Sequence, residues 1–148
     1  MRGPALVGGV PELTSVRVRR YECQACGACM LVVPREILPR RLYTAPAIGL
    51  ALCLWGLLAA TEAAVRRRVS PLLVVGAAAH GTWITLHRWA SAMTAGRLLA
   101  IVTSRAPPSE TMTRRRQAAR GIVAIVALAP GEPSLEAAAF AGATCHLG

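Results

Sequence analysis

The chain has 148 residues, which suits one domain or a small module followed by a helical one. Apolar residues make up 54% of it, so a chain that is disordered throughout is excluded. All 17 basic residues are arginine, all 7 acids are glutamate, and the net charge is +10. This charge needs a polyanionic partner, a membrane surface or a solubilising role, and the planar fork of arginine suits phosphate.

The N-terminal region predicts a short β-hairpin. Residues 1–15 are rich in Gly and Pro and are expected to form a loose lead-in. Val16–Tyr21 alternates apolar and basic residues, as an exposed strand does. Leu31–Val33, just before Pro34, predicts a second short strand. The cysteines between these two segments would lie at the turn of the hairpin.

That turn contains Cys23, Cys26 and Gly27, the Cys-x-x-Cys-Gly half of a zinc ribbon. A tight turn lets two thiolates reach one tetrahedral metal while backbone N–H groups point at the sulfurs. A closed zinc site needs four ligands. The zinc site is therefore incomplete in this chain, and we expect zinc to bind weakly or not at all.

An iron–sulfur cluster is a competing and more distant interpretation. The bacterial ferredoxin run C-x2-C-x2-C-x3-C-P matches at Cys23, Cys26, Cys29 and Pro34. Val33 stands where that run has its fourth cysteine, so one ligand of the cluster is missing.

The spacing of the cysteines also indicates the cellular compartment of the protein. The remaining cysteines, Cys53 and Cys145, are too far from the first three for a regular disulfide framework. The first 16 residues lack the apolar region of a signal peptide. We therefore expect a reducing, cytoplasmic location.

Helices are predicted after residue 44. Residues 45–60 are apolar on all sides, which indicates either a buried core helix or a membrane span. Residues 61–69 predict a short helix with Thr61 as its cap, Glu62 in its first turn and three arginines in its last turn. Ser70 followed by Pro71 predicts the start of another helix.

The membrane interpretation depends on two uncharged stretches. Residues 42–61 are long enough to span a bilayer, and residues 69–87 form a second such stretch. Arginines precede, separate and follow the two stretches, so both sides of the membrane would be basic, without a positive-inside bias. We favour a core helix and keep a small basic membrane protein with one or two spans as the alternative.

Residues 82–93 predict a two-sided helix. Its apolar face, expected in the core, consists of Trp83, Leu86, Trp89, Ala90 and Met93. Its opposite face carries Thr85, His87, Arg88 and Ser91. Short helices joined by tight turns, the last with an exposed polar face, are typical of a helix-turn-helix module. Arg88 is the best candidate for a base-edge or phosphate contact, and the arginines at 66–68 would flank it with no acidic neighbours. Beyond a loop over residues 96–109, residues 113–129 and a segment capped by Ser134 predict two more helices.

The order of these segments resembles bacterial transposase-like proteins, in which a zinc ribbon precedes a helix-turn-helix. The matching segments are Arg-Arg-Tyr-x-Cys-x-x-Cys-Gly at residues 19–27, Leu-Pro-Arg-Arg-x-Tyr at residues 38–43 and Thr-Leu-x-Arg-Trp at residues 85–89. The resemblance covers residues 16–95 and implies DNA binding, with the two cysteines of the knuckle as one ligand pair. The second Cys-x-x-Cys pair, which such ribbons carry upstream, is absent from residues 1–22.

The sequence thus predicts a mainly α protein with a small N-terminal β-hairpin (a partial zinc ribbon) followed by a helix-turn-helix domain, divided at residues 1–41, 42–95 and 96–148. Aspartate is absent and the glutamates are scattered, so we predict no catalytic centre and no small-molecule substrate. The predicted function is sequence-specific DNA binding of a transposase-associated or regulatory type. The candidate metal ligands, for zinc, are Cys23 and Cys26, and the candidate DNA-binding residues are Arg66, Arg67, Arg68, Thr85, His87, Arg88 and Ser91.

Overall fold

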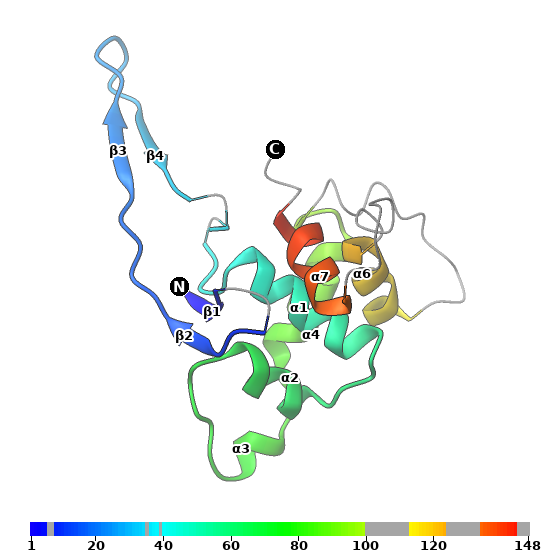
Figure 1. Ribbon diagram of the computed structural model, residues 1–148. Helices are drawn as coiled ribbons and strands as arrows, with labels where there is room; N and C mark the ends of the chain where they lie inside the picture. Colours follow the sequence, from blue (N-terminus) through cyan, green and yellow to red (C-terminus); the bar gives the residue numbers. More distant parts are fainter. Residues whose placement is uncertain (6–7, 35, 39, 100–112, 124–133, 145–148) are drawn as a thin grey trace.

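The structure is a computed structural model that describes residues 1–5, 8–34, 36–38, 40–99, 113–123 and 134–144. A body of packed helices carries two small antiparallel hairpins, and the second hairpin projects away from the body (Figure 1). The strands are β1 (Arg2–Pro4), β2 (Pro11–Leu13), β3 (Arg19–Glu22) and β4 (Cys29–Val32). The helices in the described ranges are α1 (Ala45–Gly56), α2 (Glu62–Val69), α3 (Ala77–His80), α4 (Ile84–Thr94), α6 (Arg114–Val123) and α7 (Leu135–Thr144). The predicted hairpin with cysteines at its turn is confirmed, and helices follow it along the chain.

Helix α1 forms the centre of the body (Figure 1). Thr44 caps it, because the Thr44 side chain accepts a hydrogen bond of 3.3 Å from the Ala47 N–H. Every residue of α1 except Leu54 is buried, and the helix packs against α2, α4, α6 and α7. The predicted core helix is confirmed, although it ends at Gly56. In the part of the chain that the structure describes, no helix is both long and apolar enough to cross a membrane.

Two glycines of α1 let its neighbours approach closely. A Cβ on Gly56 would lie 2.4 Å from the Arg115 carbonyl oxygen of α6. A Cβ on Gly49 would lie 2.7 Å from the Ala143 Cβ of α7. Both separations are too short for real contacts in a close-packed interior, so the absence of a side chain permits this helix packing.

Helix α2 begins and ends as predicted, but the helix predicted from Pro71 is wrong. The Thr61 side chain accepts a hydrogen bond of 3.3 Å from the Ala64 N–H at the start of α2. Ser70 is extended and ends α2 instead of starting a new helix. Leu72 and Leu73 are exposed, so a helix here would have no core to pack against. Residues 70–83, including the single turn α3, separate α2 from α4, whereas a helix-turn-helix has a turn of about 3–4 residues.

Helix α4 has the predicted core face. Leu86 and Met93 are fully buried, and Trp83 and Trp89 pack edge-to-face with ring centroids 5.3 Å apart. Tyr43, from the segment before α1, joins them with its ring centroid 5.1 Å from that of Trp89. This aromatic cluster fixes the segment before α1 against α4.

The expected loose lead-in is wrong, because the first residues dock on the body. β1 pairs with β2 and also forms a parallel bridge between Arg2 and Tyr43. A Cβ on Gly3 would lie 2.3 Å from the Ala47 Cβ, so glycine is what allows β1 to lie directly on the start of α1.

The C-terminal helices pack on the other side of α1. The predicted cap is confirmed, since Ser134 Oγ accepts a hydrogen bond of 3.2 Å from the Ala137 N–H at the start of α7. The predicted helix from residue 113 is confirmed as α6 up to Val123. Its predicted remainder, and most of the predicted loop over residues 96–109, lie outside the described residues.

Candidate nucleic-acid interface

A cleft of about 420 Å³ lies where β1, the segment before α1, the end of α2 and the start of α4 meet. We call it the arginine cleft, because Arg2, Arg40, Arg41 and Arg66 line it. Its other lining residues are Leu42, Tyr43, Ser70, Leu72, Val74, Trp83, Thr85 and Trp89. None of these described lining residues is acidic, so the cleft gathers positive charge.

The docking of β1 brings Arg2 to this cleft. The Arg2 N–H donates to the Leu42 carbonyl oxygen at 2.8 Å, and the Thr44 N–H donates to the Arg2 carbonyl oxygen at 3.1 Å. The Arg2 guanidinium lies 5.8 Å from the centroid of the Tyr43 ring, within range of a cation–π contact. The long-range pairing of β1 thus adds a charge that is remote in sequence from the others.

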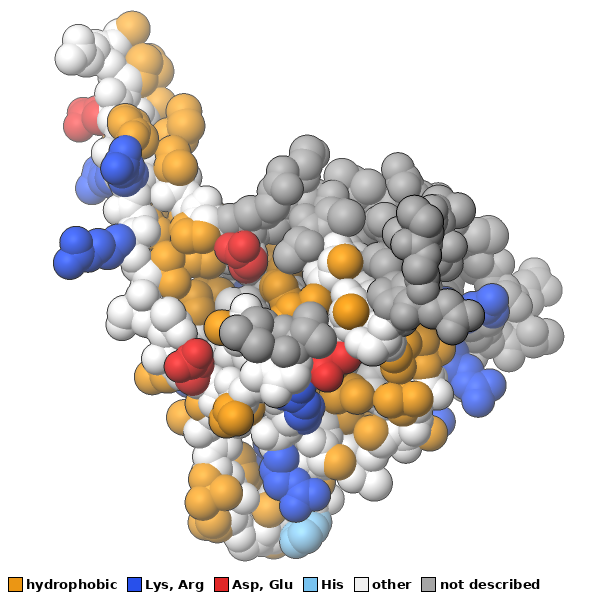
Figure 2. All heavy atoms as spheres, viewed as in Figure 1, with side chains coloured by type: hydrophobic (Ala, Val, Ile, Leu, Met, Phe, Trp, Pro, Cys, Tyr) orange, Lys and Arg blue, Asp and Glu red, His pale blue; other side chains and the backbone are white. Residues whose placement is uncertain are grey.

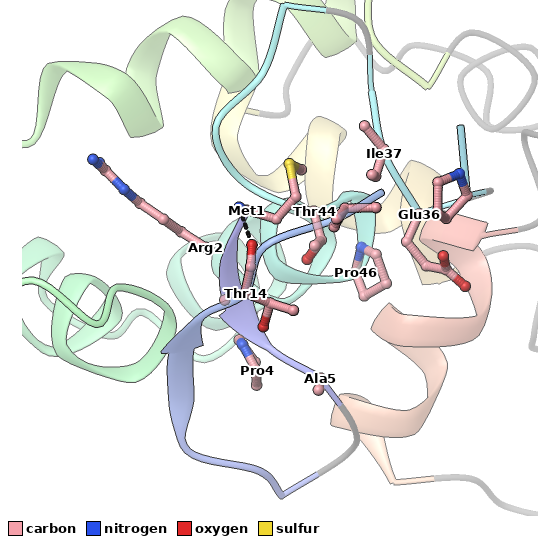
Figure 3. Close-up of a pocket in the computed structure, with 12 residues that line it drawn as sticks. Met1, Arg2, Pro4, Ala5, Thr14, Glu36, Ile37, Thr44 and Pro46 are labelled. Atoms are coloured by element: carbon pink, nitrogen blue, oxygen red, sulfur yellow. Dashed lines mark hydrogen bonds between the residues drawn. The ribbon is translucent and has the colours of Figure 1, made fainter. Parts of the chain in front are cut away.

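A smaller pocket of about 180 Å³ lies on the other side of β1 and is a weaker candidate for binding anions (Figure 3). The Arg2 side chain extends away from the other residues drawn there (Figure 3). The pocket lining includes the Glu36 carboxylate, and the Met1 amino group donates to the Thr14 carbonyl oxygen at 2.7 Å.

Arg40 and Arg41 come from the turn that precedes α1. Arg40 has a φ of 58°, in the left-handed region, and the Arg41 N–H donates to the Leu38 carbonyl oxygen at 3.2 Å. Leu38 is buried in the core, so the turn is anchored at its first residue. The two arginines therefore reach the cleft from a turn that the body holds in place.

Arg66 lies in the wall of the cleft on α2 and holds the α3 segment. Its Nη1 donates to the Ala78 carbonyl oxygen at 2.9 Å, and its Nη2 donates to the Gly81 carbonyl oxygen at 3.4 Å. Its guanidinium lies 5.7 Å from the centroid of the Trp83 ring. Its Nε is buried and has no hydrogen-bond partner among the described residues. Arg66 therefore has a structural role and retains one buried donor.

The other two arginines predicted on α2 have different environments. Arg68 donates to the Gly9 carbonyl oxygen at 2.6 Å and pairs with Glu136 of α7. Arg67 is exposed and lines a second cleft of about 470 Å³ together with Arg66. Arg68 thus joins three parts of the body, while Arg67 faces solvent as predicted.

The four residues predicted on the polar face of α4 do not form one surface. Thr85 is half-buried and lines the arginine cleft, and Arg88 is exposed. His87 Nε2 lies 2.7 Å from Glu62 Oε1, and the His87 ring packs edge-to-face on Trp55 at 4.8 Å between centroids. Ser91, one turn beyond His87, is half-buried. Residues two apart on a helix point in different directions, which separates His87 from Thr85.

Glu62 corrects the expectation that the basic cluster has no acidic neighbours. Its carboxylate accepts hydrogen bonds from the Trp83 N–H and from His87, and Arg66 lies nearby. Burial alone would raise the pKa of the Glu62 carboxyl, but Trp83, His87 and Arg66 together lower it below its ordinary value. Glu62 therefore fixes the start of α4 against α2, and His87 belongs to this contact.

The predicted metal ligands lie at the tip of the β3–β4 hairpin. The Cys23 N–H donates to the Ala28 carbonyl oxygen and the Gly27 N–H to the Cys23 carbonyl oxygen, both at 2.8 Å. Gly27 has a φ of 68°, which glycine adopts without strain. Backbone N–H groups of Cys26 and Ala25, with the Cys26 side chain, lower the pKa of the Cys23 thiol.

The other two described cysteines do not complete that pair. Cys29, on β4, accepts a hydrogen bond of 3.0 Å from Arg20 Nη2. Cys53 is buried in α1, and burial raises the pKa of its thiol to about 12. Over the described ranges, no three side chains of the metal-binding types gather into one group. The hairpin tip thus carries two exposed free thiols, Cys23 and Cys26.

Sequence reasoning missed three arginines of the cleft: Arg2, Arg40 and Arg41. The Leu-Pro-Arg-Arg-x-Tyr segment was a signal that could have pointed to two of them. Arg2 gave no such signal, because only the docking of β1 brings it near.

No family model, curated protein or solved structure matches the chain.

Proposed function

We propose that the protein binds DNA and that the arginine cleft holds backbone phosphates. The observation that carries this proposal is the gathering of four arginines in one cleft whose described lining contains no acid. Guanidinium groups remain charged at any physiological pH. Their mutual repulsion is relieved when an anion with several acceptor oxygens enters, and phosphate matches the arginine fork.

The buried donor of Arg66 supports the same ligand. Arg66 lines the cleft, its Nη atoms are occupied by carbonyl oxygens, and its Nε has no partner within the described structure. An unsatisfied buried donor costs about 1–3 kcal/mol. The atom is shielded from solvent, so a phosphate oxygen could accept from this N–H only after Arg66 turns toward the cleft, and binding would then satisfy a group that folding leaves unpaired.

A polymer fits better than a single small anion, because the second cleft adjoins the first. Arg66 and Ser70 line both clefts, and the second adds Arg67 and His80. Acidic residues are absent from its described lining as well. Consecutive phosphates of a nucleic-acid strand would meet positive charge along this surface, which is the sequence-independent part of DNA binding.

We assign the recognition of the DNA base sequence to Arg88. It is exposed on α4, three residues from Thr85 in the cleft. Residues three apart on a helix share a face, so a strand seated in the cleft would pass close to Arg88. A bidentate arginine contact with guanine is the commonest specific base contact. His87 is left out of this role because it already pairs with Glu62.

Salt-dependent titration of a fluorescent duplex tests the proposal. The double variant Arg40→Ala/Arg41→Ala should reduce the magnitude of the slope of log affinity against log salt by about 0.9 for each phosphate that the variant no longer binds. The matched control, Arg17→Ala/Arg19→Ala, removes the same charge from exposed positions on the hairpin side. It should leave the slope nearly unchanged. Equal effects of the two double variants would show that the cleft has no special role.

A further inference from the structure

The β3–β4 hairpin projects from the helical body, and its tip lies far from the helices (Figure 1). Every residue from 17 to 34 is exposed. Hydrophobic and arginine side chains lie along the hairpin (Figure 2). The tip is therefore accessible to another molecule without obstruction from the body.

The tip of the hairpin is a tight, hydrogen-bonded turn that carries two thiols. Cys23 and Cys26 flank a turn closed by the hydrogen bond from the Gly27 N–H to the Cys23 carbonyl oxygen at 2.8 Å. The turn that carries Cys23 and Cys26 thus forms with the hairpin.

One chain cannot complete the site from the residues described. Zinc in structural sites takes four ligands in a tetrahedron, and the tip supplies two thiols. Cys29 lies on β4 beside Arg20 and belongs to no group of three metal-binding side chains in the described ranges. The described residues of one chain thus leave two ligand positions open, which a second molecule could fill.

We propose that two copies of the chain meet at their hairpin tips and share one Zn²⁺, to which each copy supplies Cys23 and Cys26. A two-fold axis through the metal would place four thiolates around it, the tetrahedral S₄ set that zinc favours. An identical second copy is the simplest source of the missing pair, because it presents the same exposed half-site. Binding releases the thiol protons to solvent.

The surface behind the tip fits a second copy. Tyr21, Met30 and Val32 share one face of the hairpin and are 51%, 64% and 49% exposed. An isolated two-stranded hairpin is marginally stable, and burial of these side chains against a second hairpin would stabilise both. Arg19 pairs with Val32 at the far end of the strands, whereas the Arg20 side chain reaches Cys29, nearer the tip.

Native mass spectrometry and light scattering of the full chain test this, with zinc and a non-thiol reductant present. We expect one zinc per two chains, a mass twice the 15.6 kDa of one chain, and return to monomers on chelation. Cys23→Ser and Cys26→Ser should each abolish the zinc-dependent dimer. Cys29→Ser is the matched control within the hairpin and should retain it, as should Cys145→Ser.

Several results would overturn the shared site. They are one zinc held by a monomer, no zinc bound, a dimer that persists after chelation, or visible absorption from an iron–sulfur cluster. Loss of the zinc-dependent dimer in Cys29→Ser or Cys145→Ser would place a ligand outside the two tip thiols and would also contradict it. Circular dichroism of each variant separates loss of the metal site from loss of the helical fold.

Discussion

The helical body and the β3–β4 hairpin differ in how much of their apolar side chains they bury. In the body, Leu86 and Met93 are fully buried, and every residue of α1 except Leu54 is buried. On the hairpin, Met30 and Leu31 remain mostly exposed, and Cys23 and Cys26 are exposed free thiols. The body thus buries its apolar side chains within one chain, whereas the hairpin leaves apolar side chains and thiols open to another molecule.

The largest expected effect is a loss of unfolding free energy, which should be large for a substitution in the body and small for one on the hairpin. Trp89→Ala removes a buried ring that packs against both Tyr43 and Trp83, and should cost about 3–5 kcal/mol of unfolding free energy. Met30→Ala, on the exposed hairpin of the monomer, should change it by about 0.5 kcal/mol or less. Urea denaturation of both variants in chelator measures the difference. Similar decreases for the two variants would show that the hairpin belongs to the cooperative core.

A smaller effect is expected at the contact between α2 and α4. The pKa of Glu62 is lowered in the folded state, so its contribution to stability is complete above the ordinary value of 4.5 and is lost as pH falls through the folded pKa. Glu62→Gln should therefore make stability less dependent on pH below about 4.5, with a change on the order of 1 kcal/mol. Urea midpoints at neutral and acid pH provide the measurement.

Glu12→Gln is the control for this effect, because it removes an exposed carboxylate of β2. It should lose as much stability on acidification as the unmodified chain does. If Glu62→Gln follows the same acid profile as the unmodified chain, the carboxylate does not hold α4 in the way described.

Local signals in the sequence predicted much of the body. Thr61 and Ser134 were identified as caps from their positions alone, and the core face of α4 followed from helical spacing. The cysteine hairpin was likewise predicted from strand alternation and a turn. Each of these features depends on residues a few positions apart, and such spacing is visible in one sequence.

What the sequence did not predict depends on distant contacts. Pro71 follows a residue that could cap a helix, but the exposed Leu72 and Leu73 have no core beside them. Arg68 was predicted to bind DNA, whereas in the structure it pairs with Glu136 of α7, which lies 68 residues further along the chain. The arginine cleft needs β1 to dock beside residues 40–43, and no periodic pattern encodes that docking.

Assignment of DNA binding to the body, and not to the hairpin, is the central claim. Side-chain Nε–H resonances of the arginines, followed by NMR during titration with a short duplex, test it most directly. The account predicts that the resonances of Arg41 and Arg66 shift first, because their side chains line the cleft, and that those of Arg17 and Arg19 shift little. Shifts confined to Arg17 and Arg19, with the cleft arginines unchanged, would contradict it.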